Sequence, residues 1–248
     1  MNSIRKLVDV ALVLGLAAIA RAAHAMGAPD CAPEELAPVD AWLARHPWKT
    51  GATTPDALVT AACKLWPYDK SVLLVAAAYA QDKEQDKNLV VALVDAQTMA
   101  IRATYQGVIV EDATWSVAQG SLHLDTARYD LAPGVRAFGI DLLSDAVDNA
   151  VVRGGATGTR SLFVQDGATL RLVLDGFVLT TSKRGADGVT TTSAKMAMGS
   201  HASHGYADMA VTRTTTPGSA KEHATLAFDG ARYVVSASGY TRHQLAGQ

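Results

Sequence analysis

Residues 162–176, LFVQDGATLRLVLDG, decide the fold class of this chain. Leucine occupies every second position from Leu170 to Leu174, and a period of two residues is typical of a strand with one buried face. The segment also contains Asp166-Gly167 and Asp175-Gly176, and Asp-Gly favours the positive φ angles of tight hairpin turns. The stretch therefore predicts antiparallel hairpins.

The same two signals extend outward in both directions. Alternating runs occur at Met99–Tyr105, Leu122–Leu124 and Phe138–Leu142. Two runs are apolar throughout, Val72–Val75 and Leu89–Val94, and they predict central strands covered on both faces. Further Asp-Gly turns are expected at Asp187-Gly188 and Asp229-Gly230. The fold class expected is mainly β, built from antiparallel meanders.

An internal similarity bears on the architecture. Leu93–Gly107 resembles Leu162–Gly176, each reading as strand, turn, strand and glycine. Two related four-stranded units would form either a β-sandwich or a small propeller-like domain. The alternative is that any two hairpins look alike.

The N-terminal part has a different pattern. Pro38 suits a first helical position, and Pro47 ends that run. A second helix is expected from Thr54-Pro55-Asp56, which reads as a cap and an acidic first turn, to Pro67. The domains expected are therefore a helical cap at 26–69, pinned by a disulfide, and an antiparallel β domain at 70–248.

Residues 1–25 read as a cleaved signal peptide. Arg5-Lys6 precede an apolar run from Leu7 to Ala20, and Ala23-His24-Ala25 supplies a small-x-small cleavage pattern. The run is short for a membrane span of about 20 residues, so an uncleaved anchor is the less favoured alternative. The expected location is therefore periplasmic or secreted.

The mature chain carries Cys31 and Cys63 and no other cysteine. In an oxidising compartment an isolated pair predicts one disulfide. Removing residues 1–25 changes the net charge from −2 to −4. A weakly acidic protein has no electrostatic footprint for nucleic acid, and no later segment approaches a membrane span.

Several blocks resemble a family of uncharacterised secreted or periplasmic proteins from proteobacteria. The blocks are Cys63–Pro67, Leu124–Gly134, Gly205–Asp208 and Phe228–Tyr233. The resemblance implies export and β structure, and it brings no activity or functional residue with it. Members of that family have extra cysteines in the C-terminal half, which this chain lacks. A disulfide in that half therefore does not carry over.

The sharpest candidate site is a metal cluster of Met196, Met198, His201 and His204. Thioether and imidazole ligands together suit copper. The structural alternative is that Met196 and Met198, at strand spacing, both face the core. Copper is therefore a candidate cofactor and no other is expected.

No catalytic residue is predicted. The chain has no Gly-x-Ser-x-Gly elbow, and Gly154–Gly158 lacks the Lys-Ser/Thr pair of a phosphate-binding loop. Among the tryptophans, Trp42, Trp66 and Trp115 suit core positions. Trp48 follows Pro47 in a loop, which makes it the candidate for an exposed partner-binding residue.

We therefore expect an exported, non-enzymatic protein that binds a protein or an envelope component. An inhibitor or immunity-type partner of a cell-envelope enzyme is one form of this function. The alternatives are a periplasmic copper-binding protein and a hydrolase whose site is assembled from distant residues.

Overall fold

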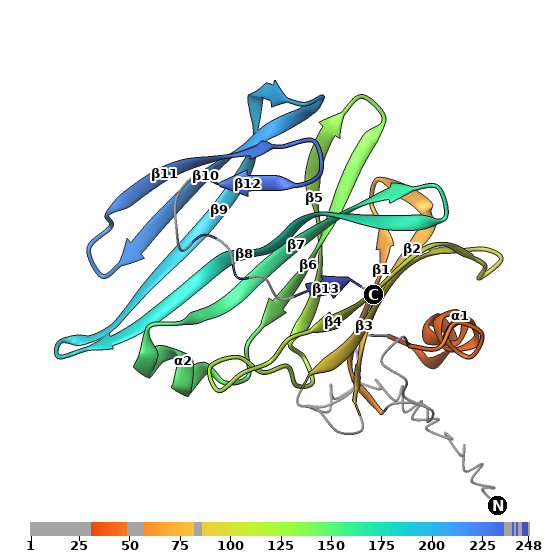
Figure 1. Cartoon of the computed structure of the whole chain (residues 1–248), viewed down its shortest axis with the longest axis horizontal. Helices are drawn as coiled ribbons and strands as arrows, with labels where there is room; N and C mark the ends of the chain where they lie inside the picture. The colour runs from red at the N-terminus through yellow and green to blue at the C-terminus, as the bar shows by residue number, and fades with distance from the viewer. Residues whose placement is uncertain are drawn as a thin grey trace, which may run out of the picture.

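The computed structural model describes residues 31–48, 57–81, 86–235, 240, 242 and 245–247. The predicted signal peptide at 1–25 lies outside these residues. The described chain forms two short helices and a 13-stranded sheet, so the mainly β class is confirmed. The sheet is open and folds back on itself in layers (Figure 1).

The first layer is an antiparallel meander of four strands. They are β1 (Leu58–Trp66), β2 (Asp69–Ala80), β3 (Lys87–Asp95) and β4 (Ile101–Ile109). The apolar runs Val72–Val75 and Leu89–Val94 lie in β2 and β3, and all their residues are buried. Their prediction as central strands is confirmed.

The second layer is also antiparallel. Its strands are β5 (Leu122–Ala132), β6 (Val135–Leu143), β7 (Ala156–Asp166) and β8 (Thr169–Gly185). A single parallel pair, Thr104 with Thr169, joins it to β4. The two layers enclose an inner core that includes Trp66, Leu74, Leu93, Trp115, Phe138 and Phe163.

The long strand β8 continues past the second layer and starts a third. The remaining strands are β9 (Gly188–Ser203), β10 (Tyr206–Thr216), β11 (Lys221–Phe228), β12 (Tyr233–Val235) and β13 (Leu245–Gly247). β9–β12 continue the antiparallel order from β8, and β13 pairs with β4. A hairpin core joins the third layer to the second and includes Tyr129, Leu162, Phe177, Met209 and Leu226.

Three of the four predicted Asp-Gly turns are confirmed. Asp166-Gly167, Asp187-Gly188 and Asp229-Gly230 lie between consecutive strands. Asp175-Gly176 is instead inside β8, so its prediction as a hairpin turn is wrong. The positive φ of Gly176, +57°, serves an irregularity in the pairing of β7 with β8, and such bulges also favour glycine.

Two helices flank the sheet. α1 (Pro33–Leu43) covers the outer face of β1–β3 through a helix core that includes Leu36, Val39, Val75 and Val90. α2 (Val147–Arg153) ends at Gly154 in a left-handed cap. Neither helix of the described chain is long and apolar enough to cross a membrane.

The prediction of a second N-terminal helix is wrong, because Leu58–Trp66 is strand β1. The β-branched pair Val59-Thr60 favours a strand, and β2 is buried on both faces and needs a partner along its edge. β1 supplies it, with Cys63 opposite Val75. The expected cap signal at residues 54–56 lies outside the described residues. The sheet thus begins before the predicted boundary at residue 70.

The first helix begins earlier than predicted. It starts at Pro33, and Pro38 lies in its interior instead of at its first position. Glu35 reaches back to accept the Ala32 N–H at 2.8 Å, which is half of a capping box. Proline in a helix interior removes one main-chain hydrogen bond, and the burial of Leu36 and Val39 against the sheet offsets that loss.

Candidate functional site

The predicted disulfide is confirmed. Cys31 and Cys63 are joined, and no free cysteine occurs in the described chain. The bond ties Cys31, two residues before α1, to the middle of β1. Cys31, Glu35 and Cys63 also have ligand-type atoms within 4.8 Å of one another, but both sulfurs are used in the bond.

The structure separates the four predicted copper ligands by environment. Met196 and Met198 are half-buried in β9 and pack against the hairpin core, as the structural alternative expected. Met198 lies opposite Met209 in β10. Copper binding by these residues stays a prediction.

The two histidines of that set lie toward the end of the β9–β10 hairpin. His201 is exposed near the end of β9. His204 occupies the turn, and its Nδ1–H donates to the Phe228 carbonyl at 2.8 Å. His204 therefore anchors this turn to the end of β11.

The structure reverses two expectations about tryptophan. Trp48 is 8% exposed and packs in the helix core, with its ring 6.0 Å from that of Tyr79. Its prediction as an exposed residue is wrong, because the chain after α1 turns back onto the sheet. Trp42, expected in the core, is only half-buried and stacks on His46 at 4.3 Å.

Trp42 lies in a hollow between α1, β4 and the β7–β8 turn. We call this hollow the helix groove. Its volume is about 430 Å³, within the usual range for a binding site. It is lined by Pro38, Ala41, Trp42, Arg45, Met99, Ala100, Ile101, Arg102, Thr104 and Ala168.

Met99 has an unusual backbone in this groove. Its φ is +56°, in the left-handed region that favours glycine or asparagine and costs other residues about 1–2 kcal/mol. The turn holds it there, since the Met99 N–H donates to the Asp95 carbonyl at 2.8 Å. The side chain packs against the helix core together with Trp42. A residue that tolerates strain while lining a hollow is a functional candidate.

The charges around the groove are arranged asymmetrically. Arg102 is fixed by Asp95 at 2.5 Å and by the Ser71 hydroxyl at 3.1 Å, with Asp69 at 3.8 Å. The Arg102 guanidinium holds the pKa of Asp95 well below its usual range. Arg45 is exposed, and no side chain in the described ranges pairs with it. The lining of the helix groove contains two guanidinium groups, from Arg45 and Arg102, and no carboxylate.

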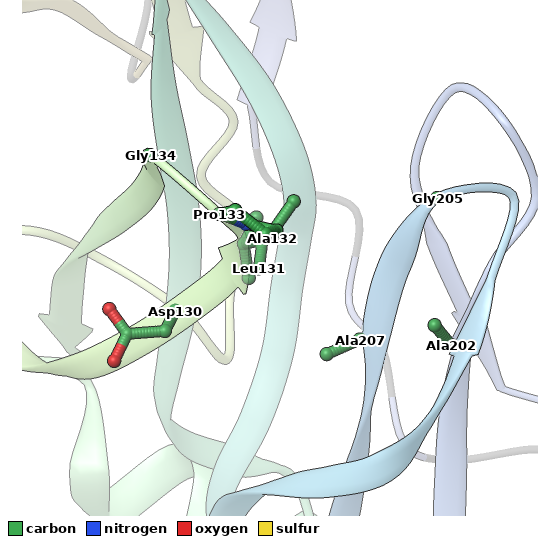
Figure 2. Close-up of a pocket in the computed structure, with 8 residues that line it drawn as sticks. All are labelled: Asp130, Leu131, Ala132, Pro133, Gly134, Ala202, Gly205 and Ala207. Atoms are coloured by element: carbon green, nitrogen blue, oxygen red, sulfur yellow. The ribbon is translucent and has the colours of Figure 1, made fainter.

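A second hollow separates two hairpin tips, and we call it the hairpin hollow. Its volume is about 450 Å³, and it is lined by Asp130, Leu131, Ala132, Pro133, Gly134, Ala202, Gly205 and Ala207. Figure 2 shows the β5–β6 tip facing the β9–β10 tip, with the Asp130 carboxylate turned away from the second hairpin. Asp130 accepts from Arg136 Nε at 2.6 Å. The remaining lining residues are apolar.

Sequence reasoning missed a charged network on β5–β7. Arg160 donates to both oxygens of Asp141 at 2.6 Å and lies 2.7 Å from Asp125. The Tyr129 hydroxyl donates to Asp125 at 2.6 Å, and burial raises the pKa of this phenol. A Cβ on Gly139 would lie 3.3 Å from the Asp125 Cβ, so this glycine leaves room for the network.

This network has a structural character. The side chains of Arg160, Asp125 and Asp141 are only 17–18% exposed, and each carboxylate is already engaged by the guanidinium. The two carboxylates therefore bind a cation that the fold itself supplies. In the sequence, the sign of this network is a charged residue, Arg160, in the middle of strand β7. Its partners lie on β5 and β6, and no spacing in the sequence shows that they meet Arg160.

Comparisons with known proteins give no assignment. No family model, no curated protein and no solved structure matches this chain.

Proposed function

We propose that this chain is an exported protein that acts by binding a segment of another protein in the helix groove. The disulfide and the absence of a membrane-crossing helix in the described chain are compatible with a periplasmic or extracellular location. A cleaved leader at 1–25 and an inhibitor or immunity-type role at the cell envelope belong to the same proposal.

The lining of the helix groove is the observation that supports binding best. Trp42, Met99 and Arg45 meet in one hollow, and Trp, Met and Arg are the residue types enriched in protein interfaces. Trp42 is half-buried and packs against the helix core. A large amphipathic side chain fixed in this way loses little entropy when a partner binds.

The groove is also held rigidly. The disulfide ties the start of α1 to β1, and Gln106 donates to the His46 carbonyl at 3.0 Å just after the helix. Arg102 is fixed by two side chains of the sheet. A pre-formed site avoids the ordering cost that a mobile site has on binding.

Affinity capture from the envelope fraction tests this function. Wild-type protein is compared with Trp42→Ala and with Leu65→Ala, a control whose side chain is 54% exposed at the far edge of β1. We expect a partner, identified by mass spectrometry and then purified, that binds the wild type and the control but binds Trp42→Ala at least about tenfold more weakly. Equal binding by all three proteins, or by none, contradicts the proposal.

A further inference from the structure

The charge of the helix groove indicates which partner segment it accepts. Its lining has two guanidinium groups, from Arg45 and Arg102, beside the apolar surfaces of Trp42, Met99 and Ile101. The carboxylates that pair with Arg102, Asp69 and Asp95, lie outside that lining.

The two arginines are not equivalent. Arg102 already bonds Ser71 and Asp95, so its charge is compensated within the fold. Arg45 lies just after α1 and is exposed, with no ion-pair partner among residues of the described ranges. A cation near a helix C-terminus is favourable to the helix, which explains its presence but leaves its guanidinium open to a ligand. Arg45 is thus the group that a bound anion would meet.

The main chain beside the groove favours a peptide over an anionic lipid surface. On this side β4 is paired from Thr104 onward, first with Thr169 of β8 and then with β13. Ile101–Ala103 precede that pairing and have no strand on this side among the described elements. An extended peptide can hydrogen-bond to such an unpaired edge.

Resting on the proposed binding function, we infer that the helix groove binds an extended peptide segment in which an acidic residue flanks a large apolar side chain. The carboxylate pairs with Arg45. The apolar side chain lies against Trp42, Met99 and Ile101. Charge complementarity selects the segment, and the apolar contact supplies most of the affinity.

Fluorescence anisotropy with labelled peptides tests this inference. The probes are short peptide pools with Leu, Phe or Trp beside a central Glu, Gln or Lys. We expect the Glu pool to bind at least about fivefold more tightly than the Gln pool, and the Lys pool to bind least. Added salt should reduce the difference in affinity between the Glu and Gln pools, because it screens the exposed ion pair between Arg45 and the peptide carboxylate.

Two charge reversals provide the matched comparison. Arg45→Glu should remove the preference for the Glu pool, whereas Arg184→Glu, at an exposed position in the β8–β9 hairpin, should keep it. Equal binding of the Glu and Gln pools to wild type overturns the inference. So does Arg45-dependent binding to phosphatidylglycerol vesicles with no binding to any peptide pool.

The outcomes also separate this inference from the function on which it rests. If Trp42-dependent capture of a protein partner holds but the peptide pools show no acidic preference, only the inference fails. If capture fails as well, both fail.

Discussion

The helix groove and the hairpin hollow have nearly the same volume, about 430 and about 450 Å³, yet they differ in what lines them. The groove combines a half-buried tryptophan, a strained methionine and two arginines. The other lining residues of the hollow are apolar and non-aromatic, and its single carboxylate is paired with Arg136. Volume alone therefore does not distinguish a binding site; the chemistry of the lining does.

The two regions also depend on different restraints. The groove is bounded by α1, which the disulfide ties to the sheet. One wall of the hollow is formed by the β5–β6 hairpin, whose strands supply the partners Asp125, Tyr129 and Asp141 to Arg160 of β7. Changes at these restraints should therefore affect the two regions separately.

Removing the disulfide should have the largest effect. The double variant Cys31→Ala/Cys63→Ala should lose about 3–4 kcal/mol of unfolding free energy, because the bond closes a loop between residues 32 apart in sequence. Urea unfolding measures this loss, and partner capture by the folded fraction should weaken with it. Unchanged stability would show that α1 is held by packing alone.

Removing Arg160 should have the second largest effect on stability. Arg160→Ala leaves Asp125 and Asp141 partly buried without their cation, and we expect a loss of about 3 kcal/mol in urea unfolding. Arg128→Ala is the control, since that side chain is 82% exposed and should change stability very little. The acidic-peptide preference of folded Arg160→Ala should match wild type. A lost preference would mean that the groove depends on this network.

A matched pair of substitutions compares the two hollows directly. Ala168→Glu places a carboxylate in the groove lining, and Ala202→Glu places one in the hollow lining. Both alanines are exposed. We expect Ala168→Glu to weaken partner binding about tenfold, or about 1.4 kcal/mol, and Ala202→Glu to leave it unchanged. The reverse result would assign binding to the hollow.

Met99 gives a smaller effect on stability. Met99→Asn relieves the left-handed strain but removes apolar contact with the helix core, so the unfolding free energy should change by less than about 1 kcal/mol. Partner affinity should fall, since the methionine contributes groove surface. A large loss of stability with unchanged affinity would show that Met99 serves only the core.

Lowering the pH should have the smallest effect on stability among these tests. Arg102 lowers the pKa of folded Asp95, so the stability from this pair is present above the unfolded pKa of about 4 and is lost as pH falls below it. Thermal unfolding of wild type and Asp95→Asn should therefore differ near neutral pH and converge in acid. A difference that persists at the lowest pH would contradict this assignment.

The sequence pattern predicted much of the sheet, through period-two alternation in strands such as β8 and through continuous apolar runs in β2 and β3. It failed at Leu58–Trp66, where Leu, Ala and Lys fit either structure and the choice was made by pairing with β2. It failed again at Asp175-Gly176, because the same dihedral serves a turn or a bulge.

The candidate site was harder to predict than the fold. The disulfide between Cys31 and Cys63 could be predicted from the number of cysteines and the expected oxidising compartment alone. Trp48 is buried and Trp42 is half-buried, the reverse of what the sequence suggested. This burial depends on how the chain after α1 packs, which local sequence does not determine. The groove itself joins residues from α1, the β3–β4 turn and the β7–β8 turn, and no spacing rule brings these together.

Site-directed photo-crosslinking tests the central claim most directly. A photoreactive side chain is placed at Ala41 in the groove and, in a separate protein, at Ala202 in the hollow; both positions are exposed. After irradiation in the native envelope, we predict one discrete adduct from Ala41 that Trp42→Ala abolishes, and no such adduct from Ala202. An adduct from Ala202 alone, or none from Ala41, would contradict the account.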